Sequence, residues 1–560
     1  MRPFLPGLAL ILSLTASAGA QHEHGAMPAP GNGVQERPRL LSGFGNSRFR
    51  VTTRSRQAQR YFDQGLDLCF AFNHDEAVRS FEEAARLDPG CAMAYWGIAY
   101  ACGPNINLPM DEFHGARAYK EVQRALVLAP KASARERAYI EALSNRYGVP
   151  PVADQHALDV AYADAMRGVT EKYPADLDAA TLFAEAMMDL RPWDYYAVDG
   201  TPNPGTDEIV STLEGVLRKN PKHVGAIHLY IHAVEASNDP GRAARYAERL
   251  PNLAPRAGHL VHMPTHVYIR TGRYDEVSTL NARAIEADKK YLGPGRLQLD
   301  PSKGMDVYRF MYYTHNIHMR WAGLCMEGRS ADAVAAARDV GVAAPVEAIR
   351  MMPPAEFLSP VVYYTFARFG KWDDMLNEPA PPADLRFATG IWHYGRALAH
   401  IAKGQLSDAL AERDSVTAIE AATPAEAVIG VQNSTRDVLH VAAQTASGKL
   451  ALAQRHPEEA VRILREAVGA QDRLRFDEPP IWYYASRQSL GAALILTGRP
   501  AEAEAVFRED LKRNPGSGWS LYGLMLAQRA TGDLTAAAET EKELKKAWAW
   551  SDITPSVTLL

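Results

Sequence analysis

The chain has 560 residues, of which 47% are hydrophobic and 23% are charged. This apolar content excludes an intrinsically disordered chain and is sufficient for a large core. The formal net charge of −5, without a long basic run, argues against nucleic acid or an anionic membrane as the partner.

The first twenty residues have the pattern of a signal peptide. Arg2 provides the positive start, residues 4–14 are apolar, and Ala18-Gly19-Ala20 has the small-x-small form that signal peptidase recognises. We therefore expect cleavage after Ala20 and a periplasmic or secreted mature protein. The apolar stretch is too short for a transmembrane anchor, and no later segment resembles a membrane-spanning helix.

A repeating pair of helices begins at Tyr61. The first helix carries an aromatic residue at Tyr61 and a small one at Gly65; the second carries Ala77 and Phe81, and Pro89 ends the pair. Small residues at Gly65 and Ala77 let two antiparallel helices pack closely. In residue type and in its 34-residue period, this pattern resembles the tetratricopeptide repeat (TPR).

The same landmarks recur along the chain. A second unit opens at Tyr95 and closes at Pro130, and a late unit runs from Gly491 through Phe507 to Pro515. Between them the match is patchier, and we count about nine or ten helix pairs. The resemblance covers most of the mature chain and implies an all-α fold, a right-handed superhelical solenoid of TPR-like helix pairs.

These patterns divide the chain into five segments. Residues 1–20 are the signal peptide, and residues 21–48, rich in proline and glycine, predict a flexible arm. The N-terminal repeats cover residues 49–345, the C-terminal repeats cover residues 346–550, and residues 551–560 form a tail.

The resemblance also indicates where a ligand would bind. In the TPR family the first helix of each pair lines the concave wall, so an unknown peptide, protein or small molecule is expected against first-helix residues. The ligand's identity does not follow, because the repeat is a scaffold with many uses.

The chain has four cysteines, too few for a disulfide-dense scaffold, and none forms a CxxC pair. Cys69 and Cys102 are a candidate disulfide, because export permits one and because the two residues fall on neighbouring helices. The alternative is that both are small buried thiols in closely packed helices.

Histidines recur in register on consecutive first helices. His228 and His232 are four residues apart, as are His262 and His266, and 34 residues separate equivalent members. A third helix continues the series at a spacing of 56 residues, because an insertion lengthens the preceding loop. The seven histidines predicted to share one patch of the concave wall are His228, His232, His259, His262, His266, His315 and His318.

Imidazoles on adjacent helical turns are a standard way to bind a transition metal. Copper, zinc and iron all accept imidazole, and the spacing does not select among them. Six or seven histidines exceed one tetrahedral site, so the pattern fits a dinuclear centre, one metal backed by further histidines, or a metal store. Glu235, three residues after His232, is a candidate ligand, an orienting carboxylate, or the catalytic acid–base if the protein is an enzyme.

Other side chains near these helices are candidate wall or substrate contacts, among them Arg270, Tyr312 and Trp193. Asn107, in a long loop, either caps a helix or reaches inward. The chain has no GxSxG elbow, HExxH motif, phosphate-binding loop or dinucleotide fingerprint, so ordinary hydrolase or nucleotide chemistry has no support.

Metal-free interpretations stay open beside the metal site. The histidines could form a polar pocket, or be structural residues copied with the repeat. The protein would then be an interaction scaffold of the cell envelope that binds a partner in its groove. The segments around His228 and His259 also resemble a group of exported bacterial TPR proteins with histidine-rich helices, which supports a site but supplies no reaction.

Overall fold

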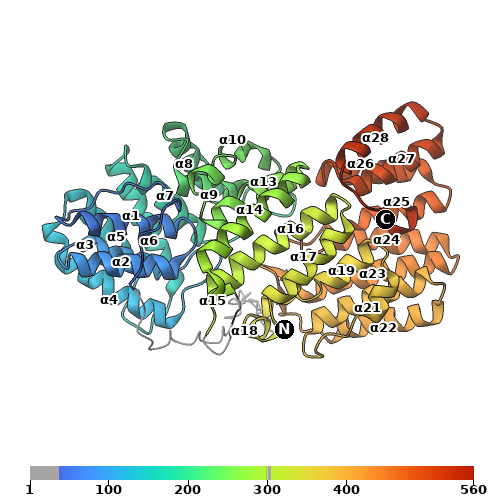
Figure 1. Ribbon diagram of the computed structural model, residues 1–560, viewed down its shortest axis with the longest axis horizontal. Helices are drawn as coiled ribbons and strands as arrows, with labels where there is room; N and C mark the ends of the chain where they lie inside the picture. Colours follow the sequence, from blue (N-terminus) through green and yellow to red (C-terminus); the bar gives the residue numbers. More distant parts are fainter. Residues whose placement is uncertain (1–36, 298, 300–303) are drawn as a thin grey trace, which may run out of the picture.

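The computed structural model describes residues 37–297, 299 and 304–560, so the predicted signal peptide and the arm up to residue 36 lie outside the described residues. The chain forms a succession of antiparallel helix pairs packed side by side. They make an elongated array with the N-terminal helices at one end and the C-terminal helices at the other (Figure 1). The prediction of an all-α solenoid of TPR-like helix pairs is confirmed.

The helices fall into three consecutive stretches. The N-terminal stretch contains α1 (Arg56–Cys69), α2 (His74–Leu87), α3 (Ala92–Ala101), α4 (Glu112–Leu128), α5 (Ala134–Ser144), α6 (Gln155–Lys172), α7 (Leu177–Asp189) and α8 (Thr206–Lys219). The middle stretch contains α9 (Val224–Val234), α10 (Ala244–Ala247), α11 (Leu250–Leu253), α12 (Gly258–His262), α13 (Pro264–Thr271), α14 (Tyr274–Leu292), α15 (Pro294–Leu297), the π-helical turn η4 (Tyr308–Tyr313), α16 (Thr314–Met326), α17 (Ser330–Ala343) and α18 (Val346–Met351).

The C-terminal stretch contains α19 (Val361–Arg368), α20 (Trp372–Asn377), α21 (Arg386–Ala402), α22 (Leu406–Ala422), α23 (Thr435–Ala453), α24 (Pro457–Gln471), α25 (Ser486–Leu496), α26 (Pro500–Arg513), α27 (Gly518–Thr531) and α28 (Leu534–Ala547). A two-stranded antiparallel hairpin, β1 (Val428–Ile429) with β2 (Asn433–Ser434), lies between α22 and α23. Short 3-10 turns connect several of the helices elsewhere.

Small residues hold neighbouring pairs together, as the repeat pattern predicts. The buried ring of Phe81 lies between Gly65 on α1 and Gly97 on α3. A Cβ atom built on these glycines would come within 2.6 and 2.4 Å of the ring, so no larger residue fits without rearrangement. The same arrangement recurs in the C-terminal stretch, where Phe507 packs against Gly491.

The described part of the predicted flexible arm is fixed on α1. Residues 37–48 have no helix or strand, yet their backbone is bound by side chains of that helix: the N–H of Ser47 donates to Asp67 at 2.9 Å. Just beyond the arm, Phe49 donates to Asp63 in the same way and buries its ring. In residues 37–48, polar side chains of α1 thus bind an extended backbone.

Two segments of the C-terminal stretch reach back to the middle of the array. From the β1–β2 turn, Gln432 donates to the carbonyl of Trp193, a residue 239 positions earlier. From the connection between α24 and α25, the hydroxyl of Tyr483 contacts His318. The helices that carry the predicted histidines are thus covered partly by residues from the other half of the chain.

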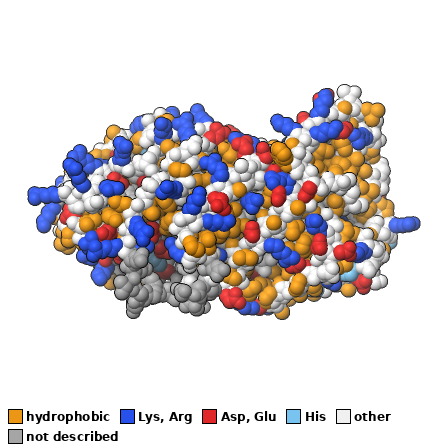
Figure 2. Space-filling view, viewed as in Figure 1, with side chains coloured by type: hydrophobic (Ala, Val, Ile, Leu, Met, Phe, Trp, Pro, Cys, Tyr) orange, Lys and Arg blue, Asp and Glu red, His pale blue; other side chains and the backbone are white. Residues whose placement is uncertain are grey.

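None of the described helices is both long and apolar enough to cross a membrane. Acidic, basic and hydrophobic side chains are interspersed over the face shown in Figure 2, without one sign of charge dominating it. The predicted histidine patch is a buried feature, since six of its seven members are at most 2% exposed.

Candidate metal centre

Three neighbouring helical segments position the predicted histidines. His228 and His232 lie one turn apart on α9, a short helix that is buried along its whole length. His259 and His262 lie on α12, and α13 follows directly with Pro264 at its first position, where a missing N–H is tolerated. Each segment carries histidines on the side that faces its neighbour, as the 34-residue register predicts.

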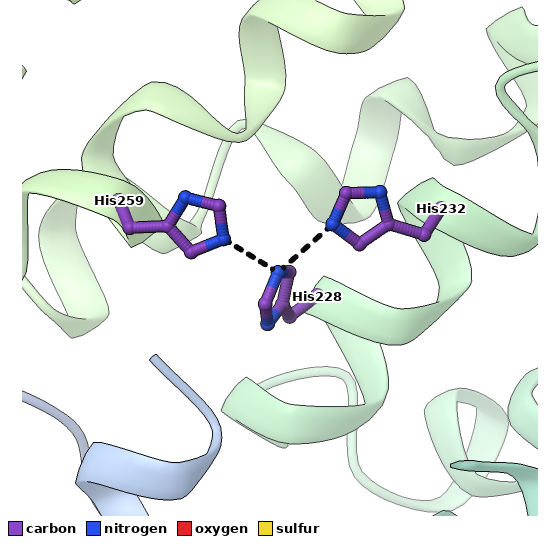
Figure 3. A group of neighbouring side chains, drawn as sticks. All are labelled: His228, His232 and His259. Atoms are coloured by element: carbon purple, nitrogen blue, oxygen red, sulfur yellow. Dashed lines mark hydrogen bonds between the residues drawn. The ribbon is translucent and has the colours of Figure 1, made fainter. Parts of the chain in front are cut away.

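The first trio consists of His228, His232 and His259. The Nε2 atom of His228 lies 3.1 Å from Nε2 of His232 and 3.0 Å from Nε2 of His259 (Figure 3). All three rings are buried and turn the same nitrogen towards a common point. This is the arrangement in which one ion could contact three imidazoles.

The second trio consists of His262, His266 and His315. The Nε2 atoms of His262 and His266 are 2.7 Å apart. The ring of His315, from α16, has its centroid 4.7 Å from that of His262 and 5.6 Å from that of His266. As in the first trio, one nitrogen from each ring lies within 4.8 Å of the others.

Glu235 joins the two trios. One of its carboxylate oxygens is 2.7 Å from Nδ1 of His232, and the other is 2.5 Å from Nδ1 of His266. Burial acts to raise the pKa of Glu235, but its interactions with His266 and His232 outweigh burial and lower the pKa to about 2. With both oxygens engaged and ionised, Glu235 orients one histidine of each trio, which is not the geometry of a general base.

Two further histidines are oriented by oxygen acceptors. Nδ1 of His228 is 2.7 Å from the carbonyl of Phe70, and Nδ1 of His262 is 2.7 Å from Oδ1 of Asn281. The amide of Asn281 cannot be reversed without loss, because its nitrogen donates to the carbonyl of Val277. Since a carbonyl oxygen can only accept, both imidazoles must carry their proton on Nδ1.

These hydrogen bonds leave unprotonated nitrogens facing each other. A neutral imidazole protonated on Nδ1 has only a lone pair on Nε2. In the first trio this leaves two lone pairs opposed at 3.1 Å, from His228 and His232. In the second trio His262 and His266 oppose two more at 2.7 Å. In each trio, two neutral imidazoles tautomerised in this way therefore turn lone pairs towards each other.

Burial also disfavours protonation of these histidines, which would otherwise place a proton between the opposed lone pairs. Desolvation, reinforced by the neighbouring imidazoles, lowers the pKa of four of the histidines well below 6.5. This holds for His228, His259, His262 and His315. At neutral pH these four imidazoles are thus neutral nitrogen donors, the form in which histidine binds metals.

His318 does not join either trio, contrary to the register prediction. It lies about 4.5 Å further along α16 than His315. Because His315 already faces the second trio, the ring of His318 stacks on Trp321 at 5.4 Å instead, and its Nε2 contacts the hydroxyl of Tyr483. The spacing of 56 residues correctly placed one histidine of this helix in the site, but not the second.

Several predicted wall contacts do gather at the first trio. Trp193 donates from its indole nitrogen to Oδ1 of Asn107 at 3.1 Å, and Asn107 donates to the hydroxyl of Tyr312 at 3.2 Å. Asn107 therefore reaches inward. Phe72, which no sequence pattern indicates, packs on the first trio and has a left-handed φ of 54°. A bulky residue in this conformation was a signal visible only in the backbone.

Polar groups gather beside α13. Arg270, one turn after His266, donates to the backbone carbonyl of Glu235 at 2.5 Å. Glu478, from the connection between α24 and α25, has two buried carboxylate oxygens without a hydrogen-bond partner among the described residues. Burial and the negative charge of Glu235 raise its pKa well above the usual value. Sequence reasoning could not find Glu478, because it lies 243 positions beyond Glu235 and outside the histidine register.

The candidate disulfide is not formed. Cys69 and Cys102 are free, buried thiols, as the alternative interpretation had it. Burial raises the pKa of Cys69 well above 9.0 and that of Cys102 to about 12, so neither side chain is poised to form the thiolate that disulfide chemistry requires.

We expect His318→Gln to reduce acid sensitivity. Burial lowers the pKa of His318 to about 3 from 6.5. Its neutral form therefore stabilises the fold above pH 6.5, and that contribution is lost as the pH falls towards 3. Glutamine does not titrate and still offers Tyr483 an acceptor. In urea unfolding of metal-free protein, the variant should gain about 1.4 kcal/mol on the wild type between pH 7.5 and 5.5. A pH-independent difference would contradict this.

Neither a protein-family model nor a curated protein sequence matches the chain. The chain is similar to the human IFIT1 dimer with m7Gppp-AAAA, at 11% identity over 89% of this chain and 92% of that one, with a TM-score of 0.35. It is also similar to yeast Tom70, at 12% identity over 87% of this chain and 99% of that one, with a TM-score of 0.32. Similarities this low support no inference about activity, ligand or partner.

Proposed function

We propose that the protein is an exported metal-binding protein that holds two transition-metal ions, one in each histidine trio. The observation that carries this proposal is the opposition of unprotonated Nε2 atoms in both trios. Four outer nitrogens are bound to oxygen acceptors, so in the neutral imidazoles the inner nitrogens carry lone pairs with no proton between them. A cation at each point would turn these repulsions into bonds.

The geometry needs little adjustment to accept such an ion. Two nitrogens that each lie about 2.1 Å from a tetrahedral zinc ion are about 3.4 Å apart. Two pairs in the first trio are separated by 3.0 and 3.1 Å, so small side-chain rotations would suffice there. His262 and His266, at 2.7 Å, would have to move further apart. Neutral nitrogen donors suit zinc, copper or iron rather than calcium or magnesium, which prefer oxygen.

The orienting groups match those found around metal-bound histidines. Such histidines generally donate their second ring nitrogen to a carboxylate or a backbone carbonyl, which fixes both tautomer and ring orientation. Glu235 does this for His232 and His266, and Phe70 does it for His228. Glu235 is thus assigned as a positioning residue rather than a catalytic one.

Elemental analysis tests the proposal directly. Mature protein purified without chelator should contain about two equivalents of zinc, copper or iron per chain, and chelator-stripped protein should rebind zinc. Circular dichroism confirms that the stripped protein is folded. Folded protein that neither retains nor rebinds metal would refute the proposal.

Folded protein without bound metal would favour the metal-free interaction scaffold, with which the helix-pair solenoid is also compatible. The scaffold would bind an extended peptide or a helix in its groove. Partner capture that survives chelation, together with absence of metal, would establish this second function.

A further inference from the structure

We propose that the two trios do different work: the first retains its ion in a site closed to water, and the second is open to a small exogenous ligand. This inference rests on the proposed metal binding. It follows from the different surroundings of two otherwise similar sets of imidazoles.

A single aromatic ring covers the first trio. The centroid of the Phe72 ring lies 4.4 Å from that of His228, 5.4 Å from that of His259 and 5.9 Å from that of His232. Towards His259 and His232 the planes are nearly parallel, at 23° and 9°. Phe72 is itself only 3% exposed, so it excludes water from this side of the trio.

Other large side chains close the flanks of the first trio. Tyr312 packs on His259 with a centroid separation of 4.6 Å, and the indole of Trp193 stands edge-on to His232 at 5.3 Å. Asn107 connects these two aromatic residues through its hydrogen bonds to both. An ion bound here would have three nitrogen ligands, and these aromatic side chains would keep water from its remaining position.

The left-handed conformation of Phe72 indicates that this cover is specifically maintained. A non-glycine residue with φ of 54° costs on the order of 1 kcal/mol or more, and such strain concentrates at functional sites. The surrounding contacts of Phe72 with the trio compensate for it. Alanine at this position would keep the backbone strain, because its Cβ remains, and would leave the trio uncovered.

Among the described residues, no Phe, Tyr or Trp ring packs on the second trio, although His262 and His266 are at most 2% exposed. Within the described chain, the rings of His262, His266 and His315 stack only on other histidines. His315 is partly exposed, and neither of its ring nitrogens forms a hydrogen bond in the part of the chain that the structure describes. An ion bound by this trio would keep a free coordination position, which is the mark of catalytic and ligand-binding metal sites.

Polar groups at the Glu235 and α13 side of the centre suit a metal-bound water or small anion. Arg270 lies one turn beyond His266 and interacts electrostatically with Glu478, whose carboxylate has no hydrogen-bond partner among the described residues. A buried carboxyl group without a partner is costly unless something completes its hydrogen bonding. Water or a protonated ligand that reaches Glu478 would do so.

Cobalt(II) and azide provide the test, since cobalt gives visible absorption and azide is a small anion that binds open positions. His228→Ala should leave one cobalt in the second trio, and azide should change its spectrum. His262→Ala should leave one cobalt in the first trio, with azide affinity lower by about tenfold or more, equivalent to 1.4 kcal/mol. Adding Phe72→Ala to His262→Ala should restore the azide response.

The outcomes separate this inference from the proposed function. Equal azide affinity in the two single variants, or a response confined to His262→Ala, would overturn the inference while leaving metal binding intact. Failure of the folded wild type to bind any cobalt or zinc would refute the proposed function, and the inference with it. The comparison of the two histidine variants suffices even where the Phe72 variant does not fold.

Discussion

Glu235→Gln is expected to weaken both metal sites through the loss of one carboxylate. An amide presents one oxygen and one NH2 group where the carboxylate presents two acceptors. It can therefore accept a hydrogen bond from either His232 or His266, but not from both. The other imidazole must move its proton to Nε2, and a protonated Nε2 cannot bind a metal.

The expected loss of zinc affinity follows from the two roles of Glu235, which supplies a negative charge and orients two imidazoles. Loss of one orienting partner typically costs 10- to 100-fold in metal affinity. We expect about a tenfold loss for the first equivalent of zinc, because the negative charge is gone, and about a hundredfold loss for the second, because one imidazole is in the wrong tautomer. Competition with a chromogenic zinc chelator measures both affinities.

Glu185→Gln is the matched control. Glu185 is also buried, at 6% exposure, and its carboxylate contacts the hydroxyl of Tyr100 rather than a histidine. This variant should bind both equivalents of zinc with wild-type affinity. Unchanged zinc affinity in Glu235→Gln, or equal losses in the two variants, would mean that Glu235 does not orient metal ligands.

The second large effect, loss of one metal ion, is expected when a single histidine is removed from either trio. His228→Ala should lose the ion of the first trio, and His262→Ala should lose that of the second, because each substitution leaves only two imidazoles. A structural zinc site with four ligands is worth about 10–16 kcal/mol, or roughly 3 kcal/mol for each ligand, so affinity should fall about 100- to 1,000-fold at the affected trio.

Elemental analysis should therefore show metal contents falling from about two to about one in each single variant, and to none in the double variant. His318→Gln serves as the control, because it changes a histidine of α16 that lies outside both trios. It should retain both ions. A single variant that loses both ions, or a control that loses one, would contradict the assignment of ligands to separate trios.

The fold could be predicted from the sequence because its main determinants are local. Gly65, Phe81 and their equivalents recur at a fixed period, and each contact they make is with a neighbouring helix pair. The arm is different, because its described part lies against α1 without a repeat pattern. Its backbone is held by Asp63 and Asp67 on α1, and such side-chain acceptors have no periodic signature.

The candidate site could be predicted only in part. The 34-residue register brought together His228, His232, His262 and His266, because equivalent positions of adjacent repeats lie side by side. It could not show which ring nitrogen faces inward, since that depends on acceptors such as Phe70. It also could not reveal Phe72, Glu478 or Tyr483, whose positions depend on backbone strain or on contacts between distant repeats.

The contacts that run from the β1–β2 turn and the α24–α25 connection to the middle helices affect how the chain should unfold. In a solenoid whose repeats touch only their neighbours, terminal repeats can melt one at a time. Here Gln432 is bound to Trp193, and Tyr483 to His318. The C-terminal repeats therefore cannot melt far without breaking contacts at the centre of the array. Thermal unfolding should approach a single cooperative transition, and limited proteolysis should not release a stable N-terminal fragment.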